Sequence, residues 1–336
     1  EYRPDAGAAR DLGPAQPPGE APPPLRRQLD RLCSWAWYAA VRPLLTALEP
    51  FVGEGRTPRL MLVPMGALGT VPWHAAYEPG SAGRRRYAVE AAQISYAASA
   101  RLLCDVSRRP DLPYSESALI VGNPTGDLRY AGEEAEALHQ GFYPRGGYLG
   151  RRASGVPDGN GTPREVLEWL RDGRSAGAVL HLACHGTVAA NDRHSSYLSL
   201  HGGELAAEEL TGTMTAEGSA RPGLVVLAAC RTHVSGRGHN EAYSLATAFL
   251  VAGARSVVGS LWTVPDDATS VLMFMTHHFL RREGQPPGRA LRSAQLWMLD
   301  RDRVAPPDMP PALAARARAV EPDDLTTWAG FTHLGR

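Results

Sequence analysis

A histidine and a cysteine each stand at the end of a short apolar run. The run 178–184 stops at His185, and the run 224–229 stops at Cys230. In an open parallel sheet the carboxyl ends of the strands lie at one edge, where ligands bind. If these two strands are neighbours, His185 can stabilise the Cys230 thiolate and then donate a proton to a leaving amine. The pattern therefore predicts a Cys–His pair for nucleophilic catalysis.

The residue after the histidine adds a second element of this chemistry. Gly186 has no side chain, so its backbone N–H can approach a substrate carbonyl. The N–H of Cys230 is a second donor at the same edge. We expect these two groups to form an oxyanion hole.

Three acidic residues and one serine are candidates for substrate binding. Asp266 and Asp267 follow the predicted strand 256–262 at the same sheet edge, where a carboxylate would suit a basic side chain. The alternative is that they cap a helix, because carboxylates are favoured at helix N-termini. Glu241 has the same two interpretations at the start of its own predicted helix. Ser195 is the fourth candidate.

The remaining histidines and cysteines near the pair favour structural roles. Cys184 adjoins His185, and successive strand residues point to opposite faces, so Cys184 should face the core. His181 shares the face of His185 but lies deeper. With Cys230 and His233 these residues are acceptable zinc ligand types, but strand alternation separates them and their spacing matches no zinc finger. We expect no metal and no other cofactor.

Composition narrows the classes of function. The 336 residues contain 35 basic and 35 acidic side chains, which gives no electrostatic basis for binding nucleic acid directly. The four cysteines are far apart and form no CxxC pair, which favours a reducing, cytoplasmic setting without a disulfide framework. No apolar run reaches the roughly 18 residues of a membrane helix. The stretch 122–126 lacks a phosphate-loop lysine, so nucleotide binding is not expected.

Short apolar strands alternate with longer helical stretches along the chain. Strands are predicted over residues 59–64, 92–98, 118–121, 178–184, 224–229 and 256–262. Helices are predicted over residues 25–48, 133–140, 163–172, 241–252, 267–282 and 287–299. Strands that are apolar on both faces indicate an α/β fold with a mostly parallel sheet and helices on both faces.

Single residues mark the expected boundaries of these elements. Pro43 should divide the first helical stretch, and Thr162 should cap the helix after it. Arg84–Arg86 are expected in a solvated loop. Residues 1–24, rich in Pro, Gly and Ala, are expected to form a linker or tail.

Around His185 and Cys230 the chain resembles the CHAT family of caspase-like domains, which often accompany tetratricopeptide repeats. The motifs are HLACHG at 181–186 and LVVLAACRT at 224–232, with further blocks that extend the resemblance over roughly residues 25–336. The stretch 232–240 is not matched residue by residue. The further blocks are PMGALGTVPWHA, SYAASARLL, LIVGNPTGDL, SSYLSL, ATAFLVAGARSVVGSLWTVPDDAT and WAGF.

The resemblance implies a thiol endopeptidase with His185 and Cys230 as its dyad, acting on a protein or peptide substrate. It implies a catalytic caspase-like domain over 113–336 and a degenerate caspase-like half over 25–112. The Pro-rich start at residues 1–24 fits a joint to a regulatory repeat or sensor module, which we expect as a partner. The resemblance also suggests a role in defence or cell-death signalling. A different class remains open, because fold does not fix function. In that alternative the chain is a protein-interaction scaffold without turnover.

Overall fold

The computed structural model describes residues 25–53, 55–80, 84–109, 116–188, 196–214, 221–230, 232–233 and 244–336. The expected tail at residues 1–24 lies outside these ranges, as do Ser195 and Glu241. Everything below concerns the described residues.

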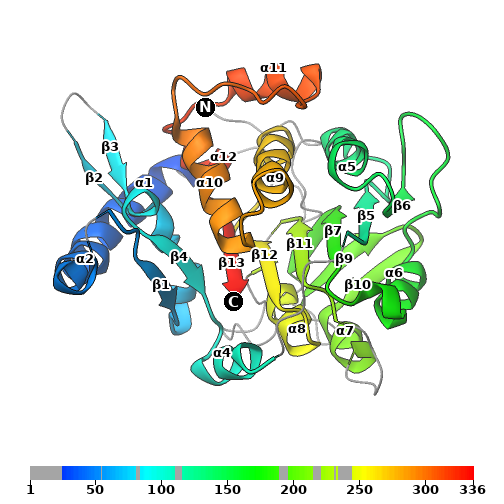
Figure 1. Ribbon diagram of the computed structural model, residues 1–336, viewed down its shortest axis with the longest axis horizontal. Coiled ribbons are helices and arrows are strands. Elements are labelled where there is room, and N and C mark those ends of the chain that lie inside the picture. The colour runs from blue at the N-terminus through cyan, green and yellow to red at the C-terminus, as the bar shows by residue number, and fades with distance from the viewer. Residues whose placement is uncertain are drawn as a thin grey trace, which may run out of the picture.

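One large sheet runs through the molecule (Figure 1). Its strands, in sheet order, are β1 (Arg59–Leu62), β4 (Gln93–Tyr96), β13 (Phe331–Gly335), β12 (Ser256–Ser260), β11 (Leu224–Ala228), β7 (Val179–Ala183), β5 (Ala118–Gly122) and β6 (Gly147–Gly150). Neighbouring strands are parallel except β12 and β13, which are antiparallel. The sheet is therefore mostly parallel, as the sequence predicts.

Smaller strands stand outside the large sheet. A second sheet contains β8 (His185–Val188), β9 (Ser196–Leu200) and β10 (Gly203–Ala206), and a hairpin contains β2 (Tyr77–Pro79) and β3 (Arg85–Tyr87). The prediction of a loop for Arg84–Arg86 was wrong, because the last two of these arginines belong to β3. Antiparallel pairing with β2 supplies backbone hydrogen bonds that the charged local sequence does not predict.

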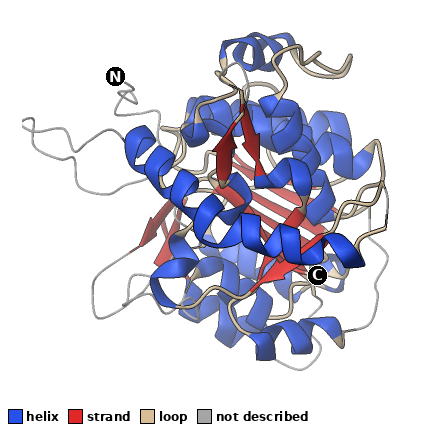
Figure 2. Ribbon diagram, turned by 90° about the vertical axis from the view of Figure 1, so that its left-hand side faces the viewer, coloured by secondary structure: helices blue, strands red, loops and turns tan. Residues whose placement is uncertain are grey.

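Helices cover both faces of the large sheet. Helices α5 (Arg129–Phe142), α9 (Asp266–Arg281) and α10 (Pro287–Leu299) lie on one face, and α6 (Pro163–Arg171), α7 (Ala207–Met214) and α8 (Leu245–Val251) lie on the other (Figure 1). The remaining helices are α1 (Leu25–Ala36), α2 (Arg42–Leu48), α3 (Ala88–Ala91), α4 (Ala100–Ser107), α11 (Pro311–Ala319) and α12 (Leu325–Trp328). Viewed from the side of α1 and α2, the strands lie between layers of helices (Figure 2).

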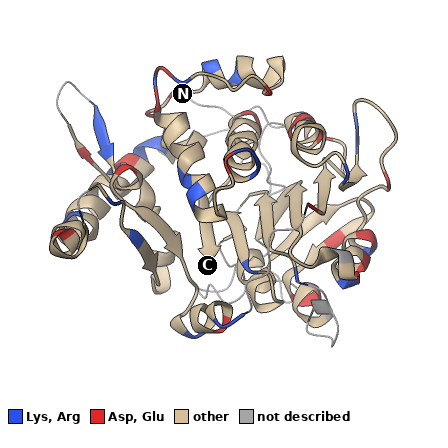
Figure 3. Ribbon diagram, in the orientation of Figure 1, with Lys and Arg blue, Asp and Glu red and all other residues tan. Residues whose placement is uncertain are grey.

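Strand alternation sorts the apolar side chains into two cores. Val179 and Val226 contribute to the core under α5 and α9, whereas Leu180 and Leu227 contribute to the core on the opposite face. The central strands β5, β7, β11 and β12 carry no Asp, Glu, Lys or Arg, whereas charges gather on helices, on loops and on the β2–β3 hairpin (Figure 3). Two-sided burial explains why these strands are apolar at successive positions.

Local signals at helix ends are confirmed. Thr162 accepts a hydrogen bond from the N–H of Glu165, whose side chain returns to the Thr162 N–H, forming a capping box. The first helical stretch is divided, since a π-helical turn at Trp37–Val41 separates α1 from α2. Pro43 lies in the first turn of α2, where its missing N–H costs least.

The predicted division of the chain at about residue 113 remains a prediction. Residues 110–115 lie outside the described ranges. On either side of them the chain contributes to the same sheet, since β4 pairs with β13 from the far end of the chain. Among the described residues no helix combines the length and apolarity needed to cross a membrane.

Candidate active site

The strands that precede the two predicted catalytic residues are neighbours. β7 and β11 are parallel, and Ala183 pairs with Ala228 at their carboxyl ends. His185 and Cys230 follow two residues later on each strand, so both emerge at the same sheet edge. Both are buried, with 4% of His185 and 0% of Cys230 exposed.

Gly186 brings the two segments into contact. A Cβ atom at this position would lie 2.5 Å from the carbonyl oxygen of Cys230 and 3.2 Å from its backbone nitrogen. Any other residue would force the segments apart. The two predicted oxyanion donors therefore belong to backbone segments that pack directly on each other.

A carboxylate that the sequence analysis did not identify completes the site. Asp127 Oδ2 lies 2.9 Å from Nε2 of His185. Partial burial alone would raise the pKa of Asp127, but hydrogen bonds from Thr125 and His185 lower it below its usual value. Asp127 thus stays ionised and orients the imidazole.

The loop after β5 presents this carboxylate. Asn123 adopts a left-handed conformation with φ of 45°, and its Oδ1 accepts hydrogen bonds from the N–H groups of Gly126 and Leu128, both at 2.9 Å. This ring of contacts closes the loop around the side chain of Asn123. Asp127 lies between Gly126 and Leu128 in the sequence, so the same loop holds it near the carboxyl end of β7.

The orientation of His185 assigns roles to its two ring nitrogens. Nε2 faces Asp127 and carries the proton of that hydrogen bond. Nδ1 is buried and has no hydrogen-bond partner in the described part of the chain. Nδ1 is thus the nitrogen that can accept a proton from a thiol.

The structure describes two of the four predicted substrate-binding residues. Asp266 is 1% exposed, and its Oδ2 accepts a hydrogen bond of 3.0 Å from the N–H of Tyr130. Asp267 accepts from the N–H of Ala268 within its own helix. Both carboxylates stand in the first turn of α9, where the helix dipole favours negative charge, but the N-cap residue is Pro265 and no side chain caps the helix by a hydrogen bond. Glu241 and Ser195 lie outside the described residues.

The other candidate ligands do not converge. Cys184 packs in the core opposite the one that contains Cys230, as strand alternation predicts. His181 contacts Glu134 inside the molecule, and His233 contacts the hydroxyl of Thr332 at 2.7 Å. No group of three or more His, Cys, Asp or Glu in the described residues is arranged to hold a metal ion.

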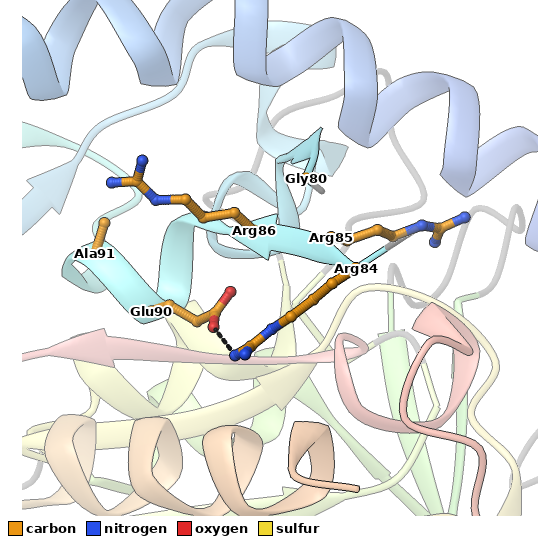
Figure 4. Close-up of a pocket in the computed structure, with 6 residues that line it drawn as sticks. All are labelled: Gly80, Arg84, Arg85, Arg86, Glu90 and Ala91. Atoms are coloured by element: carbon orange, nitrogen blue, oxygen red, sulfur yellow. Dashed lines mark hydrogen bonds and ion pairs between the residues drawn. The ribbon is translucent and has the colours of Figure 1, made fainter. Parts of the chain in front are cut away.

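A basic hollow lies apart from the dyad. It is lined by Gly80, Arg84–Arg86, Glu90 and Ala91 on and beside the β2–β3 hairpin (Figure 4). Arg84 is paired with Glu90 at 3.2 Å, and the three arginines point in different directions. In Figure 1 the hairpin lies on the left-hand side of the molecule, away from β7 and β11, which lie right of its centre.

The fold is the caspase-like α/β fold, in which a mostly parallel sheet carries helices on both faces. The chain belongs to the CHAT domain family, whose model matches residues 30–336. No protein of curated function matches the sequence.

Solved structures share this fold at low sequence identity. The complex of the pro- and mature domains of Porphyromonas gingivalis RgpB is 12% identical, with a TM-score of 0.51 over 94% of this chain and 77% of that one. The Arg-specific cysteine proteinase gingipain R (RgpB) is also 12% identical, with a TM-score of 0.51 over 93% of this chain and 74% of that one. The Saccharomyces cerevisiae separase–securin complex at 3.0 Å is 12% identical, with a TM-score of 0.50 over 82% of this chain. The chain corresponds to only 15% of that separase chain.

Proposed function

We propose that the protein is a cysteine endopeptidase with Cys230 as nucleophile and His185 as general acid and base. The observation that carries this proposal is the meeting of the two strand ends, with the backbone at Gly186 packed against Cys230. Asp127 supports it, because a carboxylate beside Nε2 stabilises the imidazolium that forms when the thiol is deprotonated.

The reaction follows from these positions. Nδ1 of His185 takes the thiol proton, and the thiolate attacks the carbonyl carbon of a peptide bond. The N–H groups of Gly186 and Cys230 stabilise the negative oxygen of the tetrahedral intermediate. His185 then protonates the leaving amine, the C–N bond breaks, and a thioester remains. Water, deprotonated by the same histidine, hydrolyses the thioester and restores the thiol.

Burial of the dyad argues for regulation by another protein. A peptide cannot reach a thiol that is 0% exposed unless the surrounding structure moves. We infer that an attached or partner module causes this movement. The relatives whose structures contain securin or a pro-domain support a protein as that partner. Free thiols at all four cysteines agree with a cytoplasmic location of the enzyme. A role in defence signalling would agree with the same location.

Replacement of the nucleophile tests the proposal. Cys230→Ala is expected to abolish cleavage of an unfolded protein substrate. The variant should still fold, because removing one buried sulfur atom costs only about 1 kcal/mol. Cys104→Ala, at an exposed cysteine on α4, is the matched control and should keep full activity. Equal cleavage by the Cys230 variant would refute the mechanism. Absence of cleavage by the wild type, even with its partner proteins, would favour the scaffold.

A further inference from the structure

Four buried polar side chains, joined in a row by hydrogen bonds, lie beneath the site. Oε1 of Glu134 is 2.7 Å from Nε2 of His181, whose Nδ1 is 3.1 Å from Nε2 of His277. Nδ1 of His277 is 2.7 Å from the hydroxyl of Tyr143. All four residues are almost completely excluded from solvent.

One arrangement of protons satisfies every hydrogen bond among these four side chains. Tyr143 donates to His277, His277 donates through Nε2 to His181, and His181 donates through Nε2 to the carboxylate of Glu134. Burial raises the pKa of Tyr143, so its hydroxyl keeps the proton. Burial lowers the pKa of His277 well below its usual range, so this ring stays neutral.

These contacts fix helix α5 at its middle and at its end. Glu134 on α5 contacts His181 on β7, and Tyr143, which follows α5, contacts His277 on α9. The start of α5 is fixed as well, through the N–H of Tyr130 and the carboxylate of Asp266. α5 begins two residues after Asp127, so the position of this helix sets the position of the orienting carboxylate.

The contacts of Glu134 and of Asp127 link the same two parts of the fold. Asp127 precedes α5 by two residues and contacts His185, which lies two residues beyond the end of β7. Glu134, in the middle of α5, contacts His181 in the middle of β7. The segment 127–134 is therefore joined to the segment 181–185 by one contact at each of its two ends.

We propose that Glu134 and His181 are positioning residues for His185. Their hydrogen bond holds α5 at the offset along β7 that places Asp127 against the catalytic imidazole. Apolar packing alone would tolerate small sliding of the helix, whereas a buried carboxylate must keep its partner or suffer a large desolvation cost. This inference rests on the proposed peptidase dyad, because it explains how that dyad is aligned.

A double-mutant cycle on the full chain tests the proposal. The readout is the rate of alkylation of Cys230 between pH 6 and 9, followed by mass spectrometry. The reagent is iodoacetamide, which is far smaller than a peptide and reaches a buried thiol through local opening of the fold. Glu134→Gln is expected to lower the rate near pH 6.5 by about tenfold, since small displacements of catalytic groups have effects of this size or larger. The same substitution should have almost no effect when Asp127→Asn is already present. Glu133→Gln, at a half-buried carboxylate on the same helix, is the control and should leave the rate unchanged.

The outcomes of this cycle distinguish positioning from a direct charge effect and from a loosened fold. A direct effect of the Glu134 charge on His185, or a general loosening, would persist in the Asp127→Asn background and would overturn the proposal. An unchanged rate in Glu134→Gln would also overturn it. If Glu134→Gln does not fold, Tyr143→Phe removes only the far hydroxyl and should show a smaller effect with the same dependence on Asp127. A wild-type rate that does not depend on His185 would instead refute the peptidase dyad itself.

Discussion

Asp127→Asn is expected to slow alkylation of Cys230 near pH 6.5 by about tenfold or more. The carboxylate lies 2.9 Å from Nε2 of His185 and favours the imidazolium partner of a thiolate. An amide carries no charge and can also present an N–H to the ring, which would reverse the tautomer. The fraction of Cys230 present as thiolate beside an imidazolium should therefore fall. Rates of modification measured across pH, with each cysteine identified by mass spectrometry, check this expectation.

The control for this prediction is Asp105→Asn. Asp105 is an exposed carboxylate on α4, remote in sequence from both residues of the proposed dyad, and its replacement makes the same chemical change. It should leave the alkylation profile at the wild-type value. Identical profiles for Asp127→Asn and wild type would show that the carboxylate does not serve the dyad.

The second large effect is loss of stability in acid. Burial lowers the pKa of His74, His233 and His333 to about 4, whereas the unfolded chain has histidines near 6.5. Between these pH values the unfolded state binds more protons, so the free energy of unfolding falls as pH falls through this window and levels off below about 4. Each histidine contributes about 3 kcal/mol to this loss. Together they rival the whole stability of an ordinary domain, so unfolding is expected between pH 6 and 4.

Urea unfolding at a series of pH values measures this loss. His333→Gln cannot be protonated, so the difference in unfolding free energy between pH 7 and pH 4 should shrink by about 3 kcal/mol. His201→Gln, at an exposed histidine, is the comparison and should leave the difference as it is in wild type. A pH dependence in His333→Gln equal to that of wild type would contradict the account.

Strands and helices with strong local signals could be predicted from the sequence. The strand over 224–229 appears as Leu224–Ala228, and the helix over 287–299 has these same bounds, because apolar runs and a proline at the first turn are local signals. β13 and the β8–β10 sheet were missed. Their residues mix polar and apolar types, and they become strands through pairing with distant partners such as β12.

The candidate dyad could be predicted because each member ends an apolar run. The contact of Asp127 with His185 could not, although Asp127 stands in the quoted stretch at 119–128, because this contact depends on β5 pairing with β7 and on the Asn123-centred loop. Strand order cannot be deduced from local sequence. Asp266 illustrates the reverse case: the sequence left a helix cap and a substrate pocket open, and the structure shows its carboxylate bonded to the backbone of Tyr130.

The most direct test of the central claim compares alkylation of the four cysteines in wild type and His185→Ala. In the wild type we expect Cys230 to react fastest below neutral pH once a partner or activating condition opens the site. Loss of His185 should slow it by about hundredfold at pH 6, the factor that separates a paired thiolate from an ordinary thiol. A Cys230 that reacts at the same rate in both proteins, under every activating condition, would contradict the dyad.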